Sequence, residues 1–481
     1  MSALQNLSPL HGIKSTAFLF GANPWTHYLA LKQCADAGMR VVVVKTVSDQ
    51  SEEALAAIHR SDRLHSVKNL PHDSEILPDA VDAISPGLVT RLREEYGDDW
   101  YALPLNDYVT EYAAAFSSLF SAPCYPPGSA MIVKRKHELR RLWNEHASQF
   151  ADTLQAVEYC YLERHKDDDG FDYSPSPGFE ALPEETAFVV KPDELSSSIE
   201  IHSAASKAEA MKLAQQVCEC LLSIWSKAGK KIGTEVLPRV VIEAAIQRSA
   251  ELHPGAEFSV EFVSHQGQHY AGGITQKWTG PGFIESGHVF PAESFPEHLR
   301  QALEQSISAL LEQLNVRYGV SHWEFIVTPE ERIALVEGHL RPAGGRILEL
   351  VEHSTGAGPV AALYQGLIRD KAEFSFVPRQ TCGLFWMVPQ EPLVEVDEIK
   401  IDSEVRERLC LDLFVNQEGI KATPNWSRAK DWTKRFAHVM AAGENLDSIL
   451  SRCREVARSV VLYGKTNAGR ASTPLVLAID N

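Results

Sequence analysis

The stretch Ser321 to Arg346, SHWEFIVTPEERIALVEGHLRPAGGR, decides how the rest of the sequence is interpreted. Two apolar runs flank the turn Pro329 to Arg332, which predicts a β-hairpin with a four-residue loop. Counting outward from that loop places Glu324 opposite Glu337, on one face of the hairpin and within side-chain reach. Two carboxylates placed in this way repel each other unless a cation lies between them.

A solvated surface pair is the alternative interpretation of these glutamates, because most glutamates in hairpins are exposed. The residues that follow favour a binding site instead. His339 and Arg341 come next in the chain, and Gly344 and Gly345 then allow a backbone to approach a ligand closely. Carboxylates bind hard divalent cations and arginine binds phosphate oxygens, so the stretch predicts a site for a nucleoside triphosphate.

The composition is that of an ordinary globular protein of 481 residues with a formal net charge of -18. This length allows about two to four domains. The negative charge disfavours nucleic acid and anionic membrane surfaces, which require a basic face, and favours a small-molecule partner. No apolar run approaches the roughly 20 residues of a membrane span. The eight cysteines form no C-x-x-C pair, so we expect reduced thiols in a cytoplasmic protein.

Strands and helices alternate at the start of the chain. The apolar run Thr16 to Phe20, a helical pattern from Trp25 to Ala37 and the strand Arg40 to Thr46 predict a β-α-β unit that opens a parallel sheet. The glycines of a dinucleotide-binding fingerprint are missing after Gly21, which disfavours a dehydrogenase. Prolines at 123–128 mark the end of this domain. Further helices and one strand are expected at 52–60, 86–96, 108–120 and 100–105.

The next part of the chain predicts a small α+β unit. Strands are expected at 187–191 and 240–245, with a helix at 207–226 between them. The segment 164–185 is rich in acid, proline, glycine and serine, and we expect it to form an exposed loop. We interpret the unit as a lid that precedes a larger C-terminal body.

Lys191 lies near the end of the apolar strand Phe188 to Pro192, where its charge can reach a phosphate. Ser196, Ser197 and Ser198 lie in the loop that follows. Their hydroxyls and the successive backbone N–H groups could hold phosphate as a glycine-rich loop does. A plain serine-rich turn is the alternative.

Single acidic residues lie in two later apolar runs. Glu243 lies within Val240 to Ile246, and Glu257 and Glu261 lie where the next run begins. A carboxylate in such a place can accept hydrogen bonds from an adenine amino group or from ribose hydroxyls. A simple position at a strand edge is the alternative for each.

Together with the segments 134–140, 272–291 and 435–443, these stretches resemble the ATP-grasp superfamily of carboxylate-amine ligases, most closely its L-amino-acid ligase (dipeptide synthase) branch. The resemblance implies an α/β protein with an α+β lid, that is, an ATP-grasp fold with an N-terminal Rossmann-like pre-ATP-grasp domain. The implied domains are the pre-ATP-grasp domain at 1–128, the lid and linking helix at 129–245, and the body with the metal site and closing subdomain at 246–481.

The resemblance assigns roles on the nucleotide side. Lys136 and Lys191 match phosphate-contacting lysines, and Glu243 matches a hinge acid near adenine. Glu257 or Glu261 matches a later acid near the sugar. The implied nucleotide-binding set is Lys136, Lys191, Ser196, Ser197, Ser198, Glu243, Ile246, Glu257 and Glu261.

The resemblance also implies a metal site. Glu324 and Glu337 match two magnesium carboxylates, with His339 as a further ligand. Arg341 matches the arginine that steadies the transferred phosphate. The sequence departs from the family pattern at two places. Ser196 to Ser198 replace the usual glycines of the phosphate loop, and His339 stands where many relatives have asparagine as a metal ligand.

On the substrate side, the resemblance implies that Lys277, Glu285 and His288 contact amino acid substrates. Lys277 and Arg341 are the implied catalytic residues. For His288, a structural imidazole bonded to the backbone is the alternative. The turn residues Gly344, Gly345 and Arg346 complete the implied substrate site.

The implied reaction uses ATP with Mg2+, or Mn2+ in its place. A carboxylate is activated as an acyl phosphate and is attacked by an amine, giving an amide, here a dipeptide, with release of ADP and phosphate. A kinase on the same scaffold and a non-catalytic nucleotide-binding protein are the alternatives. The resemblance implies small-molecule partners and a role in natural-product biosynthesis. It also implies a homodimer, as in many relatives.

Overall fold

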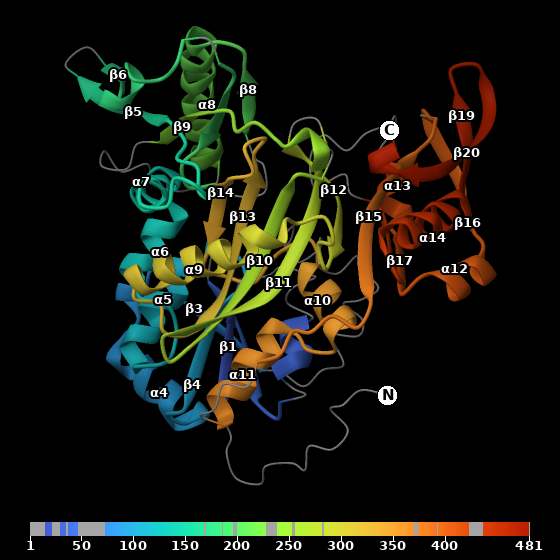
Figure 1. The fold of residues 1–481 in the computed structure, drawn as a ribbon. Helices are drawn as coiled ribbons and strands as arrows, with labels where there is room; N and C mark the ends of the chain where they lie inside the picture. Colours follow the sequence, from blue (N-terminus) through green and yellow to red (C-terminus); the bar gives the residue numbers. More distant parts are fainter. Residues whose placement is uncertain are drawn as a thin grey trace.

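The chain folds around three β-sheets, and Figure 1 shows them as an N-terminal unit, a lid, and a body that continues into a C-terminal subdomain. The structure is a computed structural model. It describes residues 15–21, 29–34, 37–46, 73–167, 170–184, 186–195, 200–227, 238–252, 255–280, 283–369, 374–391, 393–422 and 436–480. The helix predicted at 52–60 and the serines Ser196 to Ser198 lie outside these residues.

The N-terminal sheet is parallel, with the strand order β3-β2-β1-β4. Every residue of β1 and β4 is buried, because helices cover a parallel sheet on both faces. The predicted β-α-β start is confirmed, and residues 29–34 of its connecting helix are described as helical. The elements are β1 Thr16–Phe20, β2 Arg40–Thr46, β3 Asp73–Leu77, α4 Pro86–Tyr96, β4 Trp100–Pro104 and α5 Thr110–Phe120.

The lid sheet is antiparallel, with the order β6-β5-β9-β7-β8, and a long helix packs against it. The exposed loop predicted at 164–185 is wrong in its first half, which forms a hairpin in the register His165↔Asp172. An edge strand can be polar because its pairing uses backbone groups. The elements are β5 Tyr159–Asp167, β6 Gly170–Pro175, β7 Phe188–Pro192, β8 His202–Ala204, α8 Lys207–Lys227 and β9 Arg239–Ala244.

The body begins with five antiparallel strands in the order β14-β13-β10-β11-β12. Helix α9 packs on one face, and α11 packs on the other, where it also reaches the N-terminal sheet. All residues of β10 and β13 are therefore buried. The elements are β10 Glu257–His265, β11 Gln268–Thr279, β12 Glu285–Phe290, α9 Glu297–Gln313, β13 Gly319–Val327, β14 Ile333–His339, α10 Ile347–Thr355 and α11 Pro359–Arg369.

The sheet of the body continues into the C-terminal subdomain through β15. Its first residues pair with β12 and β18, and its last three pair with β20. The segment 435–443, one of the stretches that carry the resemblance, contains the strand β18, and the helix α14 follows it. The elements are β15 Thr381–Pro389, β16 Glu395–Ile401, α12 Ser403–Leu409, β17 Asp412–Val415, α13 Gln417–Ala422, β18 Ala437–Gly443, α14 Leu446–Arg458, β19 Val460–Thr466 and β20 Gly469–Leu477.

Two helices, α6 Pro127–Lys134 and α7 Lys136–Ala147, join the N-terminal unit to the lid and pack against the edge strand β14. In the described part of the chain, no helix is long and apolar enough to cross a bilayer. The eight cysteines are free thiols. The proposed domain limits at 128/129 and 245/246 fall between the three sheets.

The hairpin of β13 and β14 differs from its prediction by two single residues. Its loop has three residues, because the Thr328 N–H donates to the Arg332 carbonyl at 2.9 Å and Glu331 takes a left-handed conformation with φ of 52°. A β-bulge then adds one residue, Val336, to β14. The two differences cancel, so Glu324 pairs with Glu337 as predicted.

Candidate active site

The two hairpin glutamates are not a solvated surface pair. Their side chains are only 11% and 20% exposed, for Glu324 and Glu337 respectively. Burial raises the pKa of Glu324, but Lys277 and His322 outweigh that effect and lower it to about 2. Burial also raises the pKa of Glu337, yet His339 and the nearby lysines hold it well below its usual range. Both carboxylates are therefore ionised at neutral pH.

Lys277 on β11 lies at the centre of a group of carboxylates. Its ammonium is 2.5 Å from Glu324, 2.9 Å from Glu285 and 3.6 Å from Glu257. Burial lowers the pKa of Lys277, but these carboxylates outweigh it and raise the pKa well above the usual value. The structure thus brings together residues expected on the nucleotide, metal and substrate sides.

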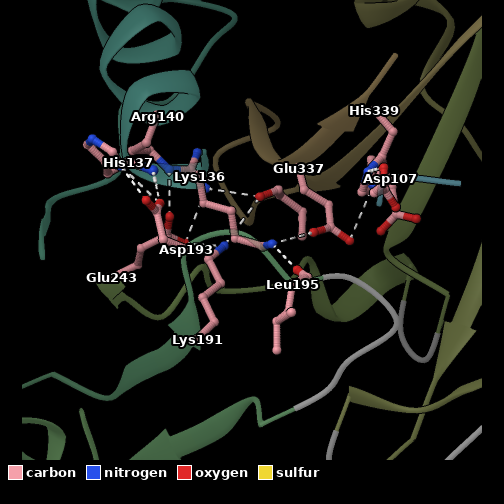
Figure 2. A network of polar contacts seen from close by, with 12 residues as sticks. Asp107, Lys136, His137, Arg140, Lys191, Asp193, Leu195, Glu243, Glu337 and His339 are labelled. Atoms are coloured by element: carbon pink, nitrogen blue, oxygen red, sulfur yellow. Dashed lines mark hydrogen bonds and ion pairs between the residues drawn. The ribbon is translucent and has the colours of Figure 1, made fainter. Parts of the chain in front are cut away.

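Two lysines of the lid side point toward the same hairpin (Figure 2). The Lys136 ammonium lies 3.7 Å from Glu337 and donates to the Leu195 carbonyl. The Lys191 ammonium lies 2.8 Å from Glu243 and 3.4 Å from the Val336 carbonyl. Burial lowers the pKa of Lys191. Two cations therefore face the carboxylates of the body across the boundary between lid and body.

Glu243 on β9 is clamped from both sides. Arg140 donates to it through Nε at 3.0 Å and Nη2 at 3.2 Å, and Lys191 pairs with it at 2.8 Å. Burial raises the pKa of Glu243, but the two cations outweigh it and lower the pKa to about 2. Ile246, its expected neighbour in nucleotide binding, is half-buried beyond the end of β9.

We expect Glu243→Gln to destabilise the protein at neutral pH by about 3–5 kcal/mol, because it leaves buried cations without their partner. The lowered pKa of Glu243 means that its ion pairs contribute fully above the ordinary value of 4.5 and are lost as pH falls toward about 2. In urea unfolding, the difference in unfolding free energy between the wild type and the variant should shrink as pH falls below 4.5. A difference that stays constant through this range would contradict the prediction.

Asp107, which precedes α5, links the N-terminal unit to the hairpin. It accepts from Arg341 Nε at 2.9 Å and lies 2.8 Å from His339 Nδ1. His339 Nε2 is in turn 3.3 Å from Glu337. Burial raises the pKa of Asp107, but Arg341 and His339 hold it well below its usual range. The sequence analysis assigned no site role to this aspartate.

The remaining expected acids have other partners. Glu257 binds Arg248 at 2.8 Å and accepts from the Thr279 hydroxyl at 3.1 Å. Glu261 is fully buried, lies 2.5 Å from His322 Nδ1 and accepts from the Ala343 N–H. In this arrangement Glu261 supports the β13–β14 hairpin through His322 and does not line an open surface.

His322 is a site residue that sequence reasoning missed. It lies 2.8 Å from Glu324 through Nε2, and its pKa is raised to about 9 because Glu261 and Glu324 outweigh the lowering effect of burial. The signal was available, since residues two apart in a strand share one face.

The expected substrate residues divide into two groups. His288 is fully buried with Nε2 at 3.7 Å from Glu285, and a Cβ added at Gly345 would lie 2.7 Å from that nitrogen. Gly345 has φ of 58°, next to the open Gly344. Arg346 instead points away, binding Asp412 at 2.6 Å, together with Glu349 and His438. It ties the body to the C-terminal subdomain.

A divalent cation fits the donors of the hairpin. Among the described residues, no three histidine, cysteine or acidic side chains form a ready metal centre. The expected trio of Glu324, Glu337 and His339 is therefore not preassembled, because His339 is held by Asp107. Magnesium, however, usually binds one or two protein carboxylates and completes its shell with water and substrate phosphates. Glu324 and Glu337, both ionised, provide that set.

Comparison with known proteins agrees with this geometry. Residues 184–349 match a family model described as an ATP-grasp domain. That segment contains β7, β9 and the hairpin, and thus the expected site residues apart from Lys136. The search of curated proteins found no match.

Solved structures share the architecture of nearly the whole chain. The L-amino acid ligase from Bacillus licheniformis has 16% identity and a TM-score of 0.67, with 94% of this chain and 99% of that chain covered. The biotin carboxylase domain of Hydrogenobacter thermophilus 2-oxoglutarate carboxylase, solved with MgADP, ADP and bicarbonate, has 8% identity, a TM-score of 0.62, and coverage of 97% and 92%. Phosphoribosylglycinamide synthetase from Anaerococcus prevotii has 12% identity and a TM-score of 0.59, with 94% of this chain and 100% of that chain covered.

Proposed function

Because this chain contains an ATP-grasp domain and has the ATP-grasp fold, we propose that it is an ATP- and magnesium-dependent ligase that joins a carboxylate to an amine. The observation that carries the proposal is the meeting of two ionised glutamates, Glu324 and Glu337, with the lid-side lysines Lys136 and Lys191. Oxygen ligands for a cation and positive charge for phosphates are what a triphosphate requires.

The residues of the site would act mainly by placing charge. ATP supplies the phosphoryl group that turns the carboxylate into an acyl phosphate. Lys136 and Lys191 would offset the charge of the phosphate oxygens, and Arg341, fixed by Asp107, would do so from the N-terminal side. Glu324 and Glu337 would hold the divalent cation. Fixed groups of this kind need no reorganisation during the reaction.

The amine side lies around Lys277, Glu285 and His288. We propose that these residues bind amino acid substrates, because a carboxylate and an imidazole beside a narrow glycine turn can recognise an ammonium group. A dipeptide is accordingly the proposed product. The likeness to a bacterial L-amino acid ligase supports this choice. Small-molecule substrates also agree with the net charge of -18.

The proposal is tested by phosphate release from ATP and Mg2+ with pairwise pools of the twenty L-amino acids, followed by mass spectrometry. We expect phosphate release to require two amino acids and to yield a product with the mass of both minus one water. ADP formed with one substrate and no condensed product would support a kinase instead. No turnover with any acid and amine pool, together with no ADP binding, would overturn the proposal.

A further inference from the structure

Arg140 on α7 is a buried arginine whose guanidinium donates hydrogen bonds to two different strands. Its side chain is 2% exposed. Beyond the two bonds to Glu243, Nη1 donates to the Leu335 carbonyl at 2.5 Å and Nη2 donates to the Val336 carbonyl at 3.3 Å. A single guanidinium therefore joins the lid strand β9 to the edge strand β14 of the body.

The two carbonyls on β14 belong to consecutive residues. In a regular strand, consecutive carbonyls point to opposite sides, so one guanidinium could not donate hydrogen bonds to both. The bulge at Val336 turns them to the same side. The planar, forked donors of arginine match such a pair, whereas the three donors of a lysine all diverge from one ammonium nitrogen.

The bulge determines which face of the sheet carries Glu337. Without the extra residue in register, Val336 would pair with Glu324, and Glu337 would turn to the opposite face. We propose that Arg140 is a positioning residue: by holding the carbonyls of Leu335 and Val336, it fixes the bulge that keeps Glu337 beside Glu324. The inference concerns register, and its consequence for metal binding rests on the proposed function.

The register can be tested without any ligand. Directly opposed strand residues lie close enough for a disulfide, so Glu324→Cys with Glu337→Cys should oxidise readily, as read by peptide mapping. Adding Arg140→Met should lower the yield at least about threefold. Arg141→Met is the matched control, because Arg141 is the next residue of α7 and forms an exposed pair with Glu145. Equal yields in all three proteins would overturn the proposal.

The consequence for the cation is read by Mn2+ binding in the presence of ADP, measured by electron paramagnetic resonance. Arg140→Met should weaken Mn2+ binding at least about tenfold, and the affinity of Arg140→Lys for Mn2+ should lie between those of the wild type and Arg140→Met. Deleting Val336 places Glu324 opposite Glu337 without a bulge. In that background Arg140→Met should therefore weaken Mn2+ binding much less. The proposal would be overturned if Arg140→Met weakened Mn2+ binding equally in both backgrounds. It would also be overturned if Arg140→Lys bound Mn2+ as tightly as the wild type. Failure of the wild type to bind Mn2+ would count against the proposed function alone.

Discussion

Replacing Glu337 with glutamine is expected to lower kcat/KM by more than the roughly 10- to 100-fold that loss of an outer-shell metal partner costs. The substitution keeps the size of the side chain and removes the negative charge that the proposed cation requires. It also leaves the lysine Lys136, 3.7 Å away, without its counter-charge. The measurement is phosphate release at saturating Mg2+, with the amino acid pair found to be active.

Glu330→Gln is the control for this prediction. Glu330 lies in the loop of the same hairpin and is 58% exposed, so its charge should not matter for the reaction. We expect wild-type activity from this variant. Glu337→Gln protein that retained activity within a few fold of the wild type would remove the carboxylate of Glu337 from the proposed cation site.

Lys277→Met is expected to cost about 3–5 kcal/mol of stability, because it removes a cation that the buried Glu257 and Glu324 share with the partly buried Glu285. Repulsion among Glu257, Glu285 and Glu324 then opposes folding. Their protonation would relieve it, so the variant should bind protons more readily when folded than when unfolded, and the defect should become smaller as pH falls. Urea unfolding at neutral and mildly acidic pH measures this.

Two variants make the Lys277 prediction specific. Lys277→Met combined with Glu285→Gln should recover part of the lost stability, since one of the repelling charges is gone. Lys400→Met changes an exposed strand lysine that lies 3.7 Å from Glu398, and it should have little effect. A double variant as unstable as Lys277→Met alone would show that lost packing, and not charge, causes the defect.

The hairpin shows why register is the hardest feature to predict from sequence. The apolar runs and the turn residues correctly indicated two paired strands. The left-handed Glu331 was not predictable, because a glutamate rarely adopts that conformation and no glycine marks the turn. The bulge at Val336 was equally hidden, since its carbonyls are held by Arg140 from a helix remote in sequence. The Glu324–Glu337 pair was predicted correctly because these two effects cancel.

The candidate site was predictable where local pattern determines it. Lys191 and Glu324 lie in strands whose apolar runs are clear in the sequence, and the structure brings both to the same region. Asp107 and Arg140 were not assigned because their partners are set by the packing of separate units. The β5–β6 hairpin, which overlaps the first half of the loop predicted at 164–185, was missed because its strands pair through backbone groups that a polar composition does not reveal.

The strand β15 has a consequence for how the protein can be shortened. All nine of its residues are buried, and it is paired along the body sheet as well as within the C-terminal subdomain. A chain cut before Thr381 would therefore leave β12 as an open, apolar edge, the kind of surface through which proteins aggregate. The C-terminal subdomain is thus no detachable appendage, and a minimal soluble version of this protein has to retain it.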